Sequence, residues 1–206
     1  MTRIVKAKDG IDEGARILKD GGLVVFPTET VYGLGANAYD ENAVANIFKA
    51  KGRPQDNPLI VHISSLDQVN DIAVDVPDEF YKLAERFMPG PLTVILKKSD
   101  KIPYVVTAGG DTVGVRMPDN AYTRQLIAKS FPLAAPSANR SKHISPTTAQ
   151  HVYEDLNGEV DLILNDGACQ VGIESTVLDL TVDVPTILRP GAVTADMLLD
   201  VVGQVS

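Results

Sequence analysis

The sequence is poor in cysteine and has no long hydrophobic run. Its only cysteine, Cys169, excludes an internal disulfide framework and a zinc site built from several cysteines, and we interpret it as a structural residue. No apolar run approaches the roughly 18–20 residues that a membrane-spanning helix needs. The first ten residues, MTRIVKAKDG, lack the apolar stretch of a secretory signal peptide. These absences predict a cytoplasmic protein that does not bind membranes.

Positive charge is also scarce, because 19 Lys and Arg residues face 27 Asp and Glu residues, for a net charge of −8. General nucleic-acid binding needs a broad basic surface, so this balance argues against it. A small basic pocket for a small anionic ligand is compatible with an acidic body. The Walker A phosphate loop, the G-x-S-x-G nucleophile elbow and the H-E-x-x-H zinc motif are absent. A bound phosphate would therefore be held by a different design.

Strand-like apolar runs alternate with segments of helical periodicity. The predicted strands are Ile4–Val5, Leu23–Phe26, Pro58–Ile63, Leu92–Leu96, Thr112–Met117, Pro132–Pro136 and Val160–Leu164, followed by a hairpin within Ser175–Leu188. Helices are predicted around residues 11–18, from Asp40, over Phe80–Phe87, after Asn120, from Ser145-Pro146 and over Ala195–Val201. Helices between strands favour parallel pairing, and the hairpin adds antiparallel pairing. We predict one α/β domain, residues 1–206, with helices packed on a twisted mixed sheet.

Four polar segments follow predicted strands, where α/β proteins tend to place ligands. The first is Pro27–Gly35, PTETVYGLG, with two threonines, a carboxylate and Tyr32. Hydroxyl groups donate and accept hydrogen bonds, which suits a polar organic ligand, although an ordinary polar turn explains the segment equally well. Gly33–Ala38 matches a loose dinucleotide-binding pattern, but that pattern requires the strand to run directly into the glycines. We therefore discount it.

The second segment, KGRPQDNP, concentrates positive charge just before a polar loop that two prolines bracket. Cations near a helix C-terminus can favour the helix dipole, and this explains Lys49. It explains Arg53 and Asn57 poorly, because both lie in a loop bounded by prolines. Arginine suits bidentate phosphate contact and Lys51 could act as a point charge, so we predict phosphate binding. His62, in the next strand, is by itself more typical of a core residue than of a catalyst.

The third and fourth segments place polar residues on or after buried strands. Alternation puts Thr112 and Arg116 on one strand face. A buried charge is costly unless paired, so Arg116 could pair with a core carboxylate or bind a substrate carboxylate. Ser137 and Asn139 follow the next strand, and Ser145 begins a helix whose N-terminus could bind an anion. A helix cap in a polar loop explains Ser145 adequately, but it explains the Ser137 and Asn139 pair weakly.

Together these segments resemble the YrdC/Sua5 family of L-threonylcarbamoyladenylate synthases, specifically its short, single-domain form. Between about Gly10 and Gly191, the family's motifs occur in order: FPTETVYGLG, KGRPQDNPLIVHI, PGPLTVIL, VGVRMP, APSANRS, SPT, ESTV and ILRPG. The resemblance implies a YrdC/RibB-like fold, with a twisted mixed sheet and a concave ligand-binding face.

The resemblance also implies a reaction. L-threonine, bicarbonate and ATP would give threonylcarbamoyl-AMP and pyrophosphate, with Mg²⁺ accompanying ATP and no metal ligands assigned among the protein side chains. Downstream threonylcarbamoyl-transfer proteins would use the product for threonylcarbamoyladenosine (t6A) modification at position 37 of ANN-reading tRNAs. Direct binding of tRNA, as double-stranded RNA, stays open.

The matched motifs imply two sets of binding residues. The ATP set is Lys51, Arg53, Asn57, Thr112, Ser137, Asn139, Ser145 and Arg189. The L-threonine set is Thr30, Tyr32, His62, Arg116, the backbone of Ala135, and Ser175. Lys51 and Arg53 would also act catalytically, by offsetting charge on the transferred phosphate and the leaving pyrophosphate.

Two other functions stay open at this point. An RNA-binding or ribosome-associated module could use the local cluster of Arg140, Lys142 and His143, although the net charge of −8 disfavours tight RNA binding. A carbamoyl-adenylate-forming protein of the hydrogenase-maturation type uses a related domain. Such proteins carry acylphosphatase and zinc-finger regions, which this sequence does not show.

Overall fold

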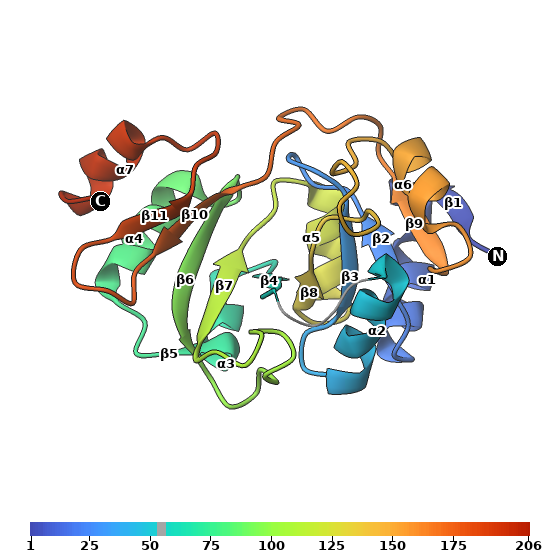
Figure 1. The fold of residues 1–206 in the computed structure, drawn as a ribbon, viewed down its shortest axis with the longest axis horizontal. Coiled ribbons are helices and arrows are strands. Elements are labelled where there is room, and N and C mark those ends of the chain that lie inside the picture. Colours follow the sequence, from blue (N-terminus) through green and yellow to red (C-terminus); the bar gives the residue numbers. More distant parts are fainter. Residues whose placement is uncertain (53–56) are drawn as a thin grey trace.

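Strands follow one another along the longest axis of the molecule, with the two termini at opposite ends (Figure 1). A computed structural model describes residues 1–52 and 57–206. The strands are β1 (Arg3–Lys6), β2 (Val24–Phe26), β3 (Gly33–Asn37), β4 (Ile60–His62), β5 (Ala73–Val74), β6 (Leu92–Lys98), β7 (Thr112–Arg116), β8 (Leu133–Ala135), β9 (Leu162–Asn165), β10 (Thr176–Asp179) and β11 (Thr186–Arg189). The helices are α1 (Ala7–Lys19), α2 (Glu41–Lys51), α3 (Val69–Ile72), α4 (Asp78–Phe87), α5 (Ala121–Ala128), α6 (Ala149–Leu156) and α7 (Ala195–Val202), with a 3₁₀ turn, η1 (Leu66–Gln68).

The sheet is mixed, as the sequence predicted. Its order is β1-β9-β2-β3-β8-β4-β7-β6-β10-β11, with β5 paired to β6 outside this path. The parallel pairs are β1–β9, β2–β9, β4–β7 and β6–β10, and the other neighbours run antiparallel. The predicted C-terminal hairpin is confirmed as β10 and β11.

Alternating residues of the sheet pack into two apolar clusters. In β2, Val24 and Phe26 join the cluster formed with α1 and α5, whereas Val25 joins the larger cluster that includes α2, α4 and α6. Successive side chains of a strand point to opposite faces, so helices cover both faces of this part of the sheet. None of the described helices is long and apolar enough to cross a bilayer.

Local sequence signals set several helix ends. The Asp40 side chain accepts hydrogen bonds from the N–H groups of Asn42 and Ala43, which caps α2 as predicted. Gly52 ends the same helix with a φ of 68°, a left-handed conformation that glycine adopts without strain. Asn120 caps α5 by accepting from the N–H of Thr123.

The predicted helix start at Ser145-Pro146 is wrong. Helix α6 begins at Ala149, and the Thr148 side chain caps it by accepting from the N–H of His151. The Pro146 carbonyl instead accepts a hydrogen bond from the Tyr32 N–H, at 3.0 Å. This contact holds the loop against the segment before β3. The chain therefore becomes helical only after Thr148.

The sequence patterns did not predict strand β3, because two of its five residues are glycines and it follows a polar segment. A Cβ atom added at Gly33 or Gly35 would lie 2.7 Å from the ring of Phe26. Glycine therefore lets this ring lie flat against β3. The ring also makes an edge contact with His62, with centroids 5.3 Å apart. The G-x-G pattern thus reflects packing of Phe26 and not dinucleotide binding.

We expect Gly35→Ala to lower the free energy of unfolding by about 1–3 kcal/mol, because the new methyl group would overlap the Phe26 ring. Urea denaturation measures this loss. The Phe26→Leu substitution removes the ring. In that background, Gly35→Ala should lower the free energy of unfolding clearly less than it does when Phe26 is present. Equal costs in the two backgrounds would show that the ring is not the obstacle.

Candidate functional site

A cavity of about 360 Å³ lies where residues of β4, β7 and β8 meet the turn before β3 and the segment before β10. It is lined by Thr28, Thr30, Val31, Gly33, Asn57, Pro58, Ile60, His62, Arg116, Ala135, Pro136, Ser137, Glu174, Ser175 and Arg189. The fold therefore brings together polar segments that lie far apart in the sequence.

Eight residues of the two predicted sets line this one cavity. Five belong to the predicted L-threonine set: Thr30, His62, Arg116, Ala135 and Ser175. Three belong to the predicted ATP set: Asn57, Ser137 and Arg189. Arg53 lies outside the described residues.

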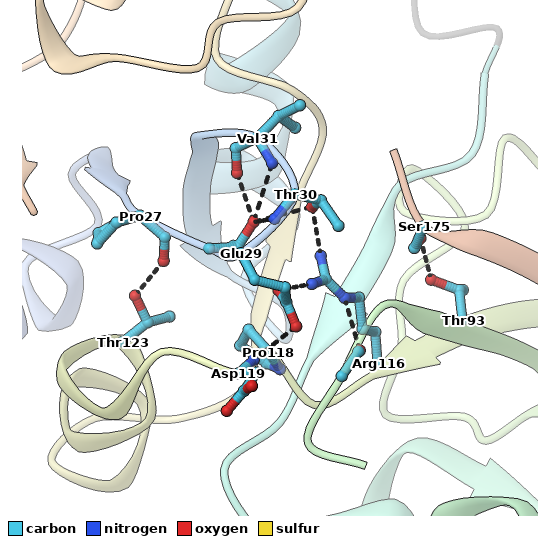
Figure 2. A network of polar contacts seen from close by, with 12 residues as sticks. Pro27, Glu29, Thr30, Val31, Thr93, Arg116, Pro118, Asp119, Thr123 and Ser175 are labelled. Carbon is cyan, nitrogen blue, oxygen red and sulfur yellow. Dashed lines mark hydrogen bonds and ion pairs between the residues drawn. The ribbon is translucent and has the colours of Figure 1, made fainter. Parts of the chain in front are cut away.

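The buried guanidinium of Arg116 is the central charged group of the site (Figure 2). Its Nε donates to the Gly90 carbonyl at 3.3 Å, and Nη1 donates to Thr30 Oγ1 at 3.1 Å. Its Nη2 forms an ion pair with Glu29, and both side chains are almost inaccessible to solvent. Burial lowers the pKa of Arg116, and the Glu29 carboxylate opposes this by favouring the charged form.

The sequence analysis assigned no role to Glu29, which is the carboxylate of the PTET motif. Its second oxygen accepts a hydrogen bond from the Asp119 N–H at 2.9 Å, and its carbonyl accepts from the Val171 N–H at 2.8 Å (Figure 2). Glu29 is not among the cavity-lining residues. It therefore acts on the cavity through Arg116. The signal that could have revealed it was the need of a buried Arg116 for a countercharge.

The turn that carries Glu29 is organised by Thr28. The Thr28 hydroxyl donates to the Val31 carbonyl at 2.5 Å and accepts from the N–H groups of Thr30 and Val31, each at 3.1 Å. These bonds satisfy the backbone of a short polar segment that lies in a buried place. The Thr123 hydroxyl also donates to the Pro27 carbonyl, at 2.6 Å (Figure 2).

His62 is a buried residue that also faces the cavity. Burial, together with the nearby charge of Arg116, lowers its pKa to about 3, and backbone carbonyls act in the opposite direction. The imidazole is therefore neutral near pH 7. Its Nδ1 lies 3.0 Å from the Ile60 carbonyl, which can only accept, so Nδ1 carries the hydrogen. His62 is therefore a core residue that also lines the cavity, and its part in binding L-threonine stays a prediction.

Ser175, Arg189 and Glu174 form a second polar group of the lining. Arg189 donates from Nε to the Ser175 carbonyl at 3.0 Å and from Nη2 to Ser175 Oγ at 3.2 Å. Its Nη1 lies 3.3 Å from a Glu174 oxygen. Behind Ser175, at 2.7 Å, is the hydroxyl of the fully buried Thr93 (Figure 2).

Lys51 and Asn139 lie next to the cavity and hold its Ser137 wall. The buried Lys51 Nζ donates to the Ser137 carbonyl at 2.5 Å. The Ser137 hydroxyl donates to Asn139 Oδ1, and the Asn139 amide donates to the carbonyls of Arg140 and His143. The predicted phosphate segment and the Ser137 and Asn139 pair are thus in direct contact.

Besides Lys51 and Asn139, three further predicted site residues do not line the cavity. Tyr32 is fully buried, and its hydroxyl donates to the Gly167 carbonyl at 2.7 Å, so it lies outside the lining of this cavity and its part in binding L-threonine stays a prediction. Burial raises its pKa to about 12. Thr112 is exposed at the far end of β7 from Arg116, and Ser145 lies in the loop before α6.

The groups that could serve other functions are largely engaged. In the proposed RNA-binding cluster, Asp155 binds Arg140 through its backbone carbonyl and His143 through its carboxylate. Burial raises the pKa of the Cys169 thiol to about 11, in keeping with a structural role. Within residues 1–52 and 57–206, no group of three His, Cys, Asp or Glu side chains could hold a metal ion.

Comparisons with known proteins point to one family. A family model for Sua5, YciO and YrdC, described as telomere recombination, matches residues 16–191. The chain is 50% identical to a threonylcarbamoyl-AMP synthase of Pyrococcus abyssi, over 100% of this chain and 62% of that protein. It is 48% identical to a threonylcarbamoyl-AMP synthase of Bacillus subtilis, over 95% of this chain and 57% of that protein.

A solved structure has the same fold. Pyrococcus abyssi Sua5 complexed with L-threonine matches with a TM-score of 0.95 at 48% identity, over 100% of this chain and 62% of that chain. The predicted α/β fold on a mixed sheet is confirmed. This chain spans about three fifths of the length of these relatives.

We expect Glu29→Ala to lower the free energy of unfolding by about 3–5 kcal/mol, because it leaves the Arg116 charge buried without a partner. The matched control is Asp71→Ala, which breaks an ion pair with Lys101 whose side chains are 54% and 63% exposed. That control should cost less than about 1 kcal/mol. Urea denaturation of both variants measures the two losses of unfolding free energy. A loss in Glu29→Ala that is no larger than the loss in Asp71→Ala would contradict the expectation.

The lowered pKa of His62 predicts a loss of stability on acidification. The unfolded chain takes up a proton near the ordinary value of 6.5, whereas the folded chain does so only near pH 3. Stability therefore falls as the pH drops from about 6.5 toward 3, by up to about 1.4 kcal/mol per pH unit.

Between pH 7 and pH 5, we expect the parent protein to lose about 2 kcal/mol more than His62→Asn loses, as measured by urea denaturation at each pH. His151→Asn, at an exposed position of α6, is the matched control and should behave as the parent does. The same loss in His62→Asn as in the parent would assign the acid sensitivity to other groups.

Proposed function

This chain belongs to the Sua5/YciO/YrdC family, and on that premise we propose that it is a threonylcarbamoyl-AMP synthase. It would convert L-threonine, bicarbonate and ATP into threonylcarbamoyl-AMP and pyrophosphate. The observation that carries the proposal is that eight residues assigned to the two larger substrates line a single cavity. We also propose that residues 1–206 act as one YrdC-like domain, which the continuous sheet supports.

Arg116 would bind the carboxylate of L-threonine. Gly90, Thr30 and Glu29 take three of its five N–H donors and hold the guanidinium plane in place. A planar guanidinium held in this way can meet a carboxylate with two parallel hydrogen bonds. Thr30 and the Ala135 carbonyl supply oxygens suited to the ammonium group.

ATP would bind along the Ser137 side of the cavity. Ser137, Asn57 and Arg189 line the cavity, and Lys51 donates to the Ser137 carbonyl. Lys51 would offset charge on the phosphates, and Asn139 would keep the Ser137 loop in shape. The roles of Arg53, Thr112 and Ser145 rest on the sequence motifs alone. Mg²⁺ would arrive with ATP, bound mainly by phosphate oxygens.

The reaction needs no covalent bond to the protein. The threonine amine would attack bicarbonate, releasing water and forming an N-carboxylate. An oxygen of that carboxylate would then attack the α-phosphate, and the bond to pyrophosphate would break. The chain's residues would position the partners and stabilise developing charge, which are the main terms in phosphoryl chemistry. The neutral His62 would shape the cavity and would not act as a charged general acid near pH 7.

The product would pass to downstream threonylcarbamoyl-transfer proteins, for t6A modification of ANN-reading tRNAs. The names of the relatives support the product itself. Tight binding of tRNA by this chain alone is less favoured, because Asp155 engages the side chains of Arg140 and His143.

The decisive assay measures pyrophosphate release from ATP, with and without L-threonine and bicarbonate. We expect release only when both are present, and release at least about tenfold slower with L-serine, which lacks one methyl group. Release that ignores threonine would indicate simple ATP hydrolysis. A folded chain that binds ATP but releases no pyrophosphate would favour a nucleotide- or RNA-binding module.

A further inference from the structure

Thr93 is a fully buried residue of β6 that no proposed role explains. It pairs in register with Val177 of β10, and its Oγ1 lies 2.7 Å from Ser175 Oγ, just before β10 (Figure 2). A hydroxyl in the core is unfavourable unless it is hydrogen-bonded. The contact with Ser175 is therefore the interaction that compensates the burial of Thr93.

Counting donors gives the direction of this hydrogen bond. A hydroxyl has one hydrogen and two lone pairs. Arg189 Nη2 can only donate, so it takes one lone pair of Ser175 Oγ. If Ser175 donated to Thr93, the Thr93 hydrogen would lack an acceptor, because Thr93 Oγ1 has no other hydrogen-bonding partner in the described part of the chain. A buried donor left unsatisfied is costly, so Thr93 donates and Ser175 accepts.

We propose that Thr93 is a positioning residue that makes Ser175 a hydrogen-bond donor toward the cavity. Arg189 and Thr93 occupy both lone pairs of Ser175 Oγ, so only its hydrogen remains for a ligand. Such a group binds an oxygen and does not suit an ammonium group. This inference rests on the proposed function: with the substrate carboxylate on Arg116, the oxygen that Ser175 meets is the hydroxyl oxygen of L-threonine.

Thr30 can accept from the substrate ammonium, which completes the match. The single hydrogen of Thr28 Oγ1 goes to the Val31 carbonyl and its two lone pairs accept from the N–H groups of Thr30 and Val31, so the 2.9 Å contact between the two threonine hydroxyls takes no lone pair of Thr30. Thr30 Oγ1 accepts from Arg116 Nη1. One lone pair is left, and it suits the substrate ammonium. The cavity thus offers a fork for a carboxylate, an acceptor for an ammonium and a donor for a hydroxyl oxygen.

Calorimetric titration with L-threonine and with L-2-aminobutyrate, which lacks the hydroxyl, tests this assignment. Thr93→Val keeps the shape of the side chain but removes its hydroxyl. We expect it to weaken L-threonine binding about five- to tenfold, the worth of one ordinary hydrogen bond, and to change L-2-aminobutyrate binding less than about twofold. Thr93→Ser should restore L-threonine binding. In a Ser175→Ala background, Thr93→Val should change L-threonine binding no further, because it acts through Ser175.

Three results would overturn the inference: unchanged L-threonine affinity in Thr93→Val, an equal loss for both amino acids, or the same loss in the Ser175→Ala background. Titration with ATP checks the rest of the site, and a matching loss of ATP affinity would mean that the cavity had collapsed and that Thr93 is a packing residue. The parent protein reports on the proposed function separately. If it binds no L-threonine at all, the proposed function fails first and the inference fails with it.

Discussion

The buried charge of Arg116 is the constraint on which the site depends. A guanidinium at the end of an interior strand requires a countercharge and several acceptors, and these come from distant parts of the chain: Glu29, Thr30 and the Gly90 carbonyl. Glu29 is held in turn by the N–H of Asp119. One charge on β7 thereby fixes the turn before β3, the turn before β6 and the start of the segment that leads to α5, and the first of these lines the cavity.

A second constraint is the shape of Phe26. Its ring occupies the space that two glycines leave on β3, and the same ring makes an edge contact with His62. The position of the imidazole at the cavity is thus set by packing between neighbouring strands. This explains how His62 can be a core residue with a pKa of about 3 and still form part of the lining.

The sequence was sufficient for features with a local signature. Asp40 capped its helix as predicted, and the apolar runs gave most strands. What it did not reveal depends on contacts between distant segments. Strand β3 looked like a loop because the ring that requires its glycines lies in β2. The resemblance to family motifs identified eight residues that line the cavity, and it grouped Tyr32 with them. A motif does not show where a side chain points, and the Tyr32 hydroxyl points toward Gly167. No sequence pattern pointed to a role for Thr93. Threonine is common in strands, and its role depends on a hydrogen-bonding partner that the sequence does not show.

Of the two larger substrates that we propose, the charged groups at the cavity fit L-threonine better than ATP. Arg116 is balanced by Glu29 and Arg189 by Glu174, while His62 is neutral near pH 7. These paired groups give a surface with separated charges and little net charge, which matches a zwitterionic amino acid. A triphosphate needs further cations, and in the described part of the chain Lys51 lies close to Ser137, on the side that we assign to ATP. Under the proposed function, a chain with a net charge of −8 would bind ATP in this way because a few cations, placed where the phosphates would lie, decide the local potential.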